Sequence, residues 1–100
     1  MHLSNNEIEN IRSFFSSQPV LKAYLFGSYS RNEGQQLSDV DILVELDYTK
    51  HIGFGFAGIQ QSLEKILNRK VDLVPAEALS SHLLPFIEKD KKLIYERSYR

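Results

Sequence analysis

The sequence contains no cysteine. This absence excludes a disulfide scaffold, a zinc site built on thiolates and a cysteine nucleophile, and it favours an intracellular protein. An excess of charge of one sign is also lacking, because 12 Lys and Arg residues stand against 13 Asp and Glu residues and the net charge is −1. This balance does not indicate a protein that binds nucleic acid or a membrane surface through its overall charge.

Long apolar segments are absent as well. No stretch approaches the length that spans a bilayer, and the N-terminal residues have neither the basic start nor the apolar run of a signal peptide. We therefore expect a cytoplasmic protein without a membrane partner. The chain has 100 residues, of which 42% are hydrophobic and 25% charged. This size and composition predict a single domain over residues 1–100 with one modest core.

Hydrophobic periodicity predicts helices that alternate with strands. Ser4 and Glu7 have the capping-box spacing at the start of a first helix, which the segment 16–19 ends. Strands are expected over 20–26, 40–46 and 70–74, the last ended by Pro75, with a short edge strand over 93–95. A short helical turn and loop are expected over 29–38, and a helix emerges from the glycine-rich segment 49–58 and ends at Asn68-Arg69. A last helix is expected over 79–90, in which Pro85 is tolerable only in the first turn. This order of elements predicts an α/β or α+β architecture.

Two aspartates flank Val40 at the start of the second predicted strand. The two-residue period of a strand places Asp39 and Asp41 on the same side. Like charges this close raise each other's pKa unless a cation lies between them, and a divalent cation is the usual solution. The motif therefore predicts a magnesium site. Taken alone, an Asp-x-Asp at a strand start is also typical of a solvated loop end.

Two other segments support a site for nucleotide chemistry. Gly27-Ser28 follows the first predicted strand, and a turn of this kind presents backbone N–H groups and a hydroxyl to phosphate oxygens, although it is also ordinary turn chemistry. Asp72 lies in the middle of a short apolar strand, where a buried carboxylate is costly unless it is paired or binds a metal ion. The alternative for Asp72 is an edge strand on which it faces water. Together these parts favour metal-assisted nucleotidyl transfer.

At this point the sequence resembles a known superfamily. The Gly-Ser-x-x-Arg and Ser-Asp-x-Asp signature of the DNA polymerase beta-like nucleotidyltransferases is matched by Gly27-Ser28-Tyr29-Ser30-Arg31 and Ser38-Asp39-Val40-Asp41. In particular the chain is similar to the minimal nucleotidyltransferases, the MNT proteins of prokaryotes. The segment 69–74 resembles the one that carries their third carboxylate, and the likeness runs over 20–97. Asn32 departs from the glycine common after the arginine, but asparagine tolerates a positive φ, so the turn is expected to survive.

The resemblance implies a small mixed sheet flanked by helices, with the acidic residues on the second and third strands. It implies that Asp39 and Asp41 hold Mg²⁺ that bridges the phosphates of ATP. Asp72 would bind a second metal ion or accept the proton of the acceptor hydroxyl.

The resemblance also implies how the nucleotide is held. Gly27 and Ser28 would bind its terminal phosphates. Arg31 would either contact phosphate or brace the loop through Glu33, and the sequence leaves both roles open.

The functional expectation rests on the same resemblance. Minimal nucleotidyltransferases are commonly paired with a small helical HEPN-domain protein, and many such antitoxins transfer AMP to a tyrosine of the HEPN ribonuclease and silence it. One alternative is an antitoxin that only binds its partner. The presence of Asp39, Asp41 and Asp72 argues against it, because a protein that only binds does not need these acids together. The other is the catalytic subunit of a split enzyme that adenylylates a small molecule such as an aminoglycoside.

Overall fold

The computed structural model describes residues 3–27, 39–50, 55–82 and 84–97. The elements within these residues are α1 (Asn5–Phe15), β1 (Val20–Phe26), β2 (Val40–Leu46), α2 (Gly55–Leu67), β3 (Val71–Pro75), the 3₁₀ helix η2 (Ala76–Ala78), α3 (Leu84–Asp90) and β4 (Lys92–Glu96). The predicted alternation of helices and strands is confirmed, and β1 and β2 have the predicted bounds. No helix in this part of the chain is both long and apolar enough to cross a bilayer.

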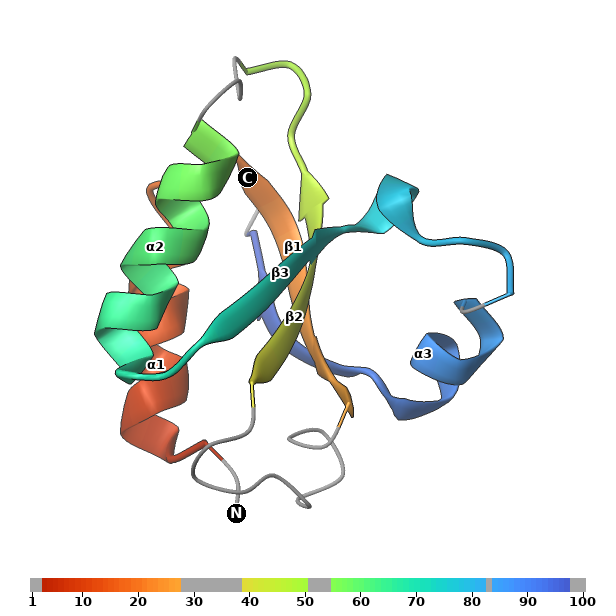
Figure 1. Cartoon of the computed structure of the whole chain (residues 1–100). Coiled ribbons are helices and arrows are strands. Elements are labelled where there is room, and N and C mark those ends of the chain that lie inside the picture. The colour runs from red at the N-terminus through yellow and green to blue at the C-terminus, as the bar shows by residue number, and fades with distance from the viewer. Residues whose placement is uncertain (1–2, 28–38, 51–54, 83, 98–100) are drawn as a thin grey trace.

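The strands form a mixed four-stranded sheet in the order β3-β2-β1-β4. β1 pairs antiparallel with both β2 and β4, whereas β2 and β3 are parallel. A parallel pair needs a crossover connection, and α2 supplies it. Helices α1 and α2 cover one face of the sheet, and α3 lies on the opposite side (Figure 1). The structure thus confirms a small mixed sheet flanked by helices.

The core lies between the sheet and helices α1 and α2. The two-residue period of β2 directs Val40, Ile42 and Val44 to this face, where all three are completely buried. The other side chains of this core cluster are Leu3, Ile11, Phe15, Val20, Ala23, Leu25, Leu46, Ile59, Leu63, Leu67, Val71, Leu73 and Ile94. Because β1 and β2 pack against α1 and α2 in this way, the residues between the core positions are held facing the other way.

The other face of the sheet, which we call the open face, carries these intervening residues. They include Tyr24 on β1, Asp41, Leu43 and Glu45 on β2, and Asp72 on β3. Leu43 is buried there, apart from the main core cluster, and the Tyr24 hydroxyl donates a hydrogen bond to Glu45 Oε2 at 3.1 Å. The carboxylates singled out on β2 and β3 therefore share the face that α1 and α2 leave uncovered.

The ends of the two long helices follow their sequence signals. Ser4 Oγ accepts a hydrogen bond from the Glu7 backbone N–H at 3.1 Å, and Glu7 Oε1 accepts one from the Ser4 N–H at 2.9 Å, so the predicted capping box is confirmed. Asn68 has a φ of 52°, the left-handed conformation that commonly follows a helix and ends it. This confirms the predicted end of α2.

The predicted bounds of α3 and β3 are wrong in detail. The helix expected over 79–90 begins only at Leu84, because a proline at position 85 is compatible with the first turn alone. β3 begins at Val71 and includes Pro75, which the sheet tolerates because β3 is an edge strand. Helix α2 begins at Gly55, within the glycine-rich segment from which it is expected to emerge. The turn predicted over 29–38 lies outside the described residues.

Candidate active site

Asp41 on β2 lies between two neighbouring strands. Its Cα partner on β3 is Asp72, and its partner on β1 is Phe26. Residues paired across adjacent strands point to the same face and stand about 4.8 Å apart. The side chains of Asp41 and Asp72 therefore lie side by side on the open face. Asp39 immediately precedes β2, at the same end of the strands as Asp41 and Asp72.

The electrostatics of Asp41 reflect its burial and its two acidic neighbours. Burial, followed by the negative charges of Asp72 and Asp39, raises the pKa of Asp41 from its ordinary value of 3.8 to about 6. A carboxylate in this position is costly to ionise without a compensating positive charge. The cluster is therefore a place where a cation, or a group carried by a cation, would be stabilised.

The structure decides between the two positions that the sequence leaves open for Asp72. Asp72 is not buried within the sheet, because β3 is an edge strand and its middle residue is exposed; Asp39 is exposed as well. Only Asp41 is partly buried. Solvent exposure of Asp72, the alternative that the sequence left open, is thus correct. The parallel register nevertheless places Asp72 beside Asp41.

The chemistry of these donors fits Mg²⁺ without forming a closed metal centre. In the described part of the chain, no group of three or more His, Cys, Asp or Glu side chains is arranged to hold a metal ion. Mg²⁺ in nucleotide enzymes is usually bound by one or two carboxylates together with substrate phosphates and water. Asp41 and Asp72 supply oxygen donors of this type. A bound cation would relieve the charge repulsion that raises the pKa of Asp41.

Gly27 follows the last residue of β1 and lies next to Asp41. Its φ is +73°, a left-handed conformation that side chains rarely adopt, and a Cβ at this position would collide with the Asp41 carboxylate. Glycine is therefore required for two independent reasons, the backbone conformation and the close approach. Of the predicted phosphate turn, the structure places Gly27 next to Asp41, whereas Ser28 and Arg31 lie outside the described residues.

We expect Gly27→Ala to damage the site more than the fold. The left-handed conformation costs an alanine about 1–2 kcal/mol in unfolding free energy, and the added methyl group displaces the Asp41 carboxylate. A displacement of about 1 Å in a reacting site is worth about 10²-fold in rate. Gly58→Ala is the matched control, because Gly58 lies in α2 with open space around it. Thermal unfolding and transfer rates of both variants would check this, and wild-type rates for Gly27→Ala would contradict it.

A set of contacts that the sequence analysis missed holds β3 against β2. The Arg69 guanidinium forms an ion pair with Glu7, although 62 residues separate them. Glu64 Oε2 accepts the Val71 N–H at 3.0 Å, and the Lys70 carbonyl accepts the Val40 N–H at 2.9 Å. The start of β3 is therefore tied to α1, to α2 and to the start of β2. These contacts set the register that brings Asp72 next to Asp41.

Glu7 is identifiable from the sequence only as a helix cap. Burial raises the pKa of Glu7, but its hydrogen bonds to Ser4 and Arg69 outweigh this effect and hold it below the ordinary value. No sequence signal pairs an acid in the first helix with an arginine after the second, because the pairing depends on how α1 and α2 pack.

We expect Arg69→Met to lower the free energy of unfolding by about 1.5–3 kcal/mol, the range for hydrogen bonds to charged groups. Only 19% of the Arg69 side chain and 24% of the Glu7 side chain are exposed, so Glu7 would lose a largely desolvated partner. Lys22→Met is the control, because its ion pair with Glu96 is much more exposed and should matter less. Equal denaturant midpoints for the two variants would contradict this role of Arg69.

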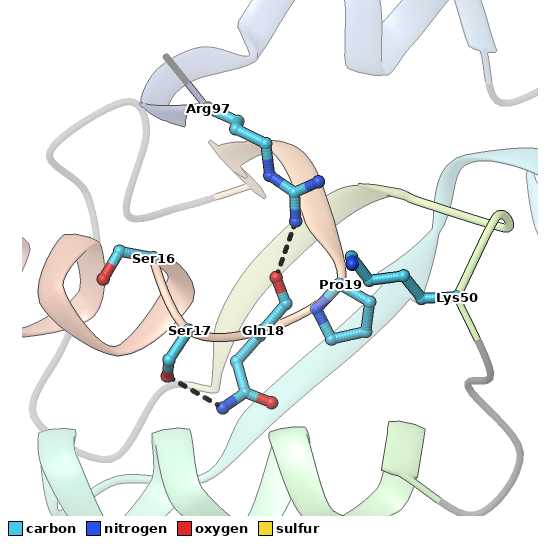
Figure 2. Close-up of a pocket in the computed structure, with 6 residues that line it drawn as sticks. All are labelled: Ser16, Ser17, Gln18, Pro19, Lys50 and Arg97. Atoms are coloured by element: carbon cyan, nitrogen blue, oxygen red, sulfur yellow. Dashed lines mark hydrogen bonds between the residues drawn. The ribbon is translucent and has the colours of Figure 1, made fainter. Parts of the chain in front are cut away.

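A polar cleft of about 430 Å³ lies away from the carboxylates, beside the ends of β2 and β4 (Figure 2). It is lined by Ser16, Ser17, Gln18, Pro19, Lys50 and Arg97. The Arg97 guanidinium donates to the Gln18 carbonyl at 2.8 Å and to Asp47 Oδ2 at 2.7 Å. These bonds tie the end of β4 to the turns that flank β1 and β2. The residues around the cleft therefore hold the fold together, and none of them is a predicted site residue.

Comparisons with known proteins agree with this geometry. The pattern of the family "Polymerase beta, Nucleotidyltransferase" matches residues 9–100. Protein adenylyltransferase MntA of Thermococcus cleftensis is 40% identical over 84 residues, which cover 79% of this chain and 84% of that protein.

Two solved structures of toxin–antitoxin complexes contain a similar chain. One, a crystal structure of a toxin–antitoxin with AMP-PNP, matches with a TM-score of 0.73 and 27% identity, over 96% of this chain and 76% of that chain. The other is a tri-AMPylated Shewanella oneidensis HEPN toxin in complex with an MNT antitoxin, with a TM-score of 0.62 and 26% identity over 91% of this chain and 68% of that chain. With the family pattern covering residues 9–100 and the sheet placing acids side by side on β2 and β3, the chain belongs to the polymerase beta nucleotidyltransferase family and is a nucleotidyltransferase.

Proposed function

We propose that this chain is a cytoplasmic protein adenylyltransferase that uses ATP and Mg²⁺ to transfer AMP to a tyrosine of a helical HEPN-domain partner, and that it acts as an antitoxin. The observation that carries this proposal is the register of β2 and β3, which sets Asp41 directly beside Asp72 on the open face. The similarity to protein adenylyltransferase MntA and to the HEPN–MNT complex supports the choice of a protein acceptor.

The reaction forms one bond and breaks another. The phenolic oxygen of the acceptor attacks the α-phosphorus of ATP, the bond between the α- and β-phosphates breaks, and pyrophosphate leaves. The phenolic proton would pass to a nearby base, a role we assign to Asp72 because its carboxylate is exposed to solvent beside Asp41. The products are AMP-tyrosine and pyrophosphate, so no oxidant or further reactant is needed.

The roles proposed for the acids follow from their positions. Asp39 and Asp41 would hold Mg²⁺ against the triphosphate, and Asp72 would bind a second Mg²⁺ or act as the base. Bound Mg²⁺ would offset the negative charge that develops on the transferring phosphoryl group. Asp41 is the central ligand in this proposal, because it is the carboxylate with the most to gain from a bound cation.

The roles proposed for the turn after β1 concern the phosphates. Gly27 would let the backbone approach them closely, and Ser28 would donate its hydroxyl. Arg31 would contact phosphate or brace the turn. Gly27 supports this proposal by its position, because a Cβ on it would collide with the Asp41 carboxylate.

We expect Mg²⁺ and ATP to bind cooperatively. A cluster of carboxylates repels a free triphosphate and attracts it only when a cation lies between them. Calorimetric titration of ATP in the presence of Mg²⁺ and again in the presence of EDTA would check this. Equal affinity under the two conditions would contradict a metal site at Asp41.

A labelling experiment tests the function. The chain is incubated with a HEPN-domain protein, Mg²⁺ and ATP labelled at either the α- or the γ-phosphate. We expect the α-label alone to appear on the partner protein. Silencing of the partner without label would identify an antitoxin that acts by binding only. Label on an added aminoglycoside and none on the partner would identify the split small-molecule enzyme instead.

A further inference from the structure

Glu64, near the end of α2, contacts the strand that carries Asp72. Its Oε2 accepts the backbone N–H of Val71 at 3.0 Å, in a part-buried position and across the connection 68–70. Val71 is the first residue of β3 and directly precedes Asp72. A hydrogen bond from a backbone N–H to a carboxylate is about twice as strong as one between neutral groups. The end of β3 that carries Asp72 is thus tied to α2 by a strong acceptor.

This bond lies on the free side of β3. β3 is an edge strand, and β2 is its neighbour in the sheet. On the side that faces β2, the Val40 N–H donates to the Lys70 carbonyl at 2.9 Å. Successive residues of a strand direct their backbone groups to alternate sides, so the Val71 N–H points away from β2 and toward Glu64. The start of β3 is therefore held from both sides, by β2 and by α2.

Asp72 depends on the backbone of β3 for its position. Val71 and Leu73 are buried in the core, 3% and 5% exposed, whereas Asp72 between them is exposed. Packing therefore does not hold its carboxylate in place. A short strand that is paired on one side opens most easily at its ends, and Asp72 is the second of five residues. Opening of the start of β3 would move Asp72 away from Asp41.

We propose that Glu64 is a positioning residue for AMP transfer, which acts through the Val71 N–H to keep the Asp72 carboxylate beside Asp41. This inference rests on the proposed function and deepens it, because it assigns a residue outside the carboxylate cluster to the chemical step. Glu64 touches neither the nucleotide nor the acceptor. The proposed nucleotide site lies at Asp41 on β2 and at Gly27 directly after β1, so it does not depend on Glu64.

The test compares variants of α2 that differ in what they offer to β3. Glu64→Ala removes the acceptor of the Val71 N–H, whereas Glu64→Gln keeps a side-chain oxygen at the same position. Gln61→Ala is the matched control, because Gln61 is an exposed polar residue of the same helix. Ile59→Val is the control for lost stability, because it removes one carbon from a buried side chain of α2 and no hydrogen bond.

Each variant is assayed for labelling of a HEPN-domain protein over a range of partner concentrations, for calorimetric binding of Mg²⁺-ATP and for thermal unfolding. We expect Glu64→Ala to lower kcat by about tenfold or more, since a displacement of about 1 Å in a reacting site is worth about 10²-fold. The KM for the partner and the Mg²⁺-ATP affinity should stay within about twofold of wild type. Glu64→Gln should restore most of kcat, and Gln61→Ala should behave like wild type.

A purely structural role for Glu64 gives a different result. Glu64→Ala would then lower the Tm and leave kcat at the wild-type value, or Ile59→Val would lower kcat equally at a similar loss of Tm. Either result would overturn the proposal. A kcat of Glu64→Gln as low as that of Glu64→Ala would overturn it as well.

Hydrogen exchange of the backbone amides separates this inference from the proposed function. In Glu64→Ala the amides of Val71 and Asp72 should exchange about tenfold faster than in wild type, while those of β1 stay unchanged. If the wild-type chain labels no partner, the proposed function fails, but faster exchange confined to β3 would still show that Glu64 holds the strand of Asp72. Unchanged exchange in β3 would refute the role of Glu64, whatever the labelling shows.

Discussion

Asp41→Asn is expected to reduce AMP transfer by about 10³-fold while the protein stays folded. The substitution removes the proposed metal ligand that lies beside Asp72, and charge stabilisation by a metal ion is worth several kcal/mol of the activation barrier. Glu45→Gln is the matched control, because Glu45 lies on the same strand and the same face but hydrogen-bonds Tyr24. Loss of transfer in both variants, or in neither, would contradict the role of Asp41.

The same substitution is expected to stabilise the metal-free protein in a pH-dependent way. Below about pH 4 the Asp41 carboxyl is protonated in both the folded and the unfolded chain. Between about pH 4 and about 6 the unfolded chain releases this proton while the folded chain keeps it, so the free energy of unfolding of the wild type falls as the pH rises.

Thermal unfolding in EDTA, with the wild type and Asp41→Asn measured side by side, reports the sign of this effect. The Tm of Asp41→Asn should rise relative to that of the wild type as the pH increases from about 4 to about 6. Above that range the difference in Tm should stay constant. A difference that is independent of pH would show that the charge of Asp41 does not destabilise the folded state.

Asp72→Asn is expected to separate nucleotide binding from chemistry. Asp72 is exposed on the edge strand, on the solvent side of Asp41, where an acceptor hydroxyl would arrive. A base acts mainly in the transition state, and its loss costs about 10²–10⁴-fold in kcat, whereas Mg²⁺-ATP affinity should stay within a few-fold of wild type. Single-turnover labelling and calorimetry on the same variant measure both quantities.

Glu77→Gln is the control for Asp72→Asn, because Glu77 is an exposed acid just beyond β3. Normal labelling by Asp72→Asn would remove Asp72 from the site and leave it an ordinary exposed residue of an edge strand. Loss of Mg²⁺-ATP binding would instead make Asp72 a ligand of the metal ion that carries the phosphates.

Much of the site could be predicted because its signals are local. The alternation over 40–46 predicts both the bounds of β2 and the face on which Asp41 stands. A strand, a helix and a second strand in sequence favour a parallel pair, so Asp72 could be expected on a strand next to Asp41. Gly27 is identifiable by its place between a buried strand and a polar segment. Ser28 and Arg31 stay predictions.

The rest depends on packing that no local pattern reports. The exposure of Asp72 follows from the place of β3 at the sheet edge, which only the complete strand order reveals. The ion pair between Glu7 and Arg69 requires α1 and α2 to be packed first. The late start of α3 is indicated by Pro85, but the apolar residues before it obscure this signal.

AMP transfer to a protein can be measured as the intact mass of a HEPN-domain partner after incubation with this chain, ATP and Mg²⁺. We expect a gain of whole AMP groups, located on tyrosine by peptide mapping, with wild type and not with Asp41→Asn or in EDTA. A partner whose mass is unchanged although its ribonuclease activity is silenced would contradict it, as would undiminished AMP addition by Asp41→Asn.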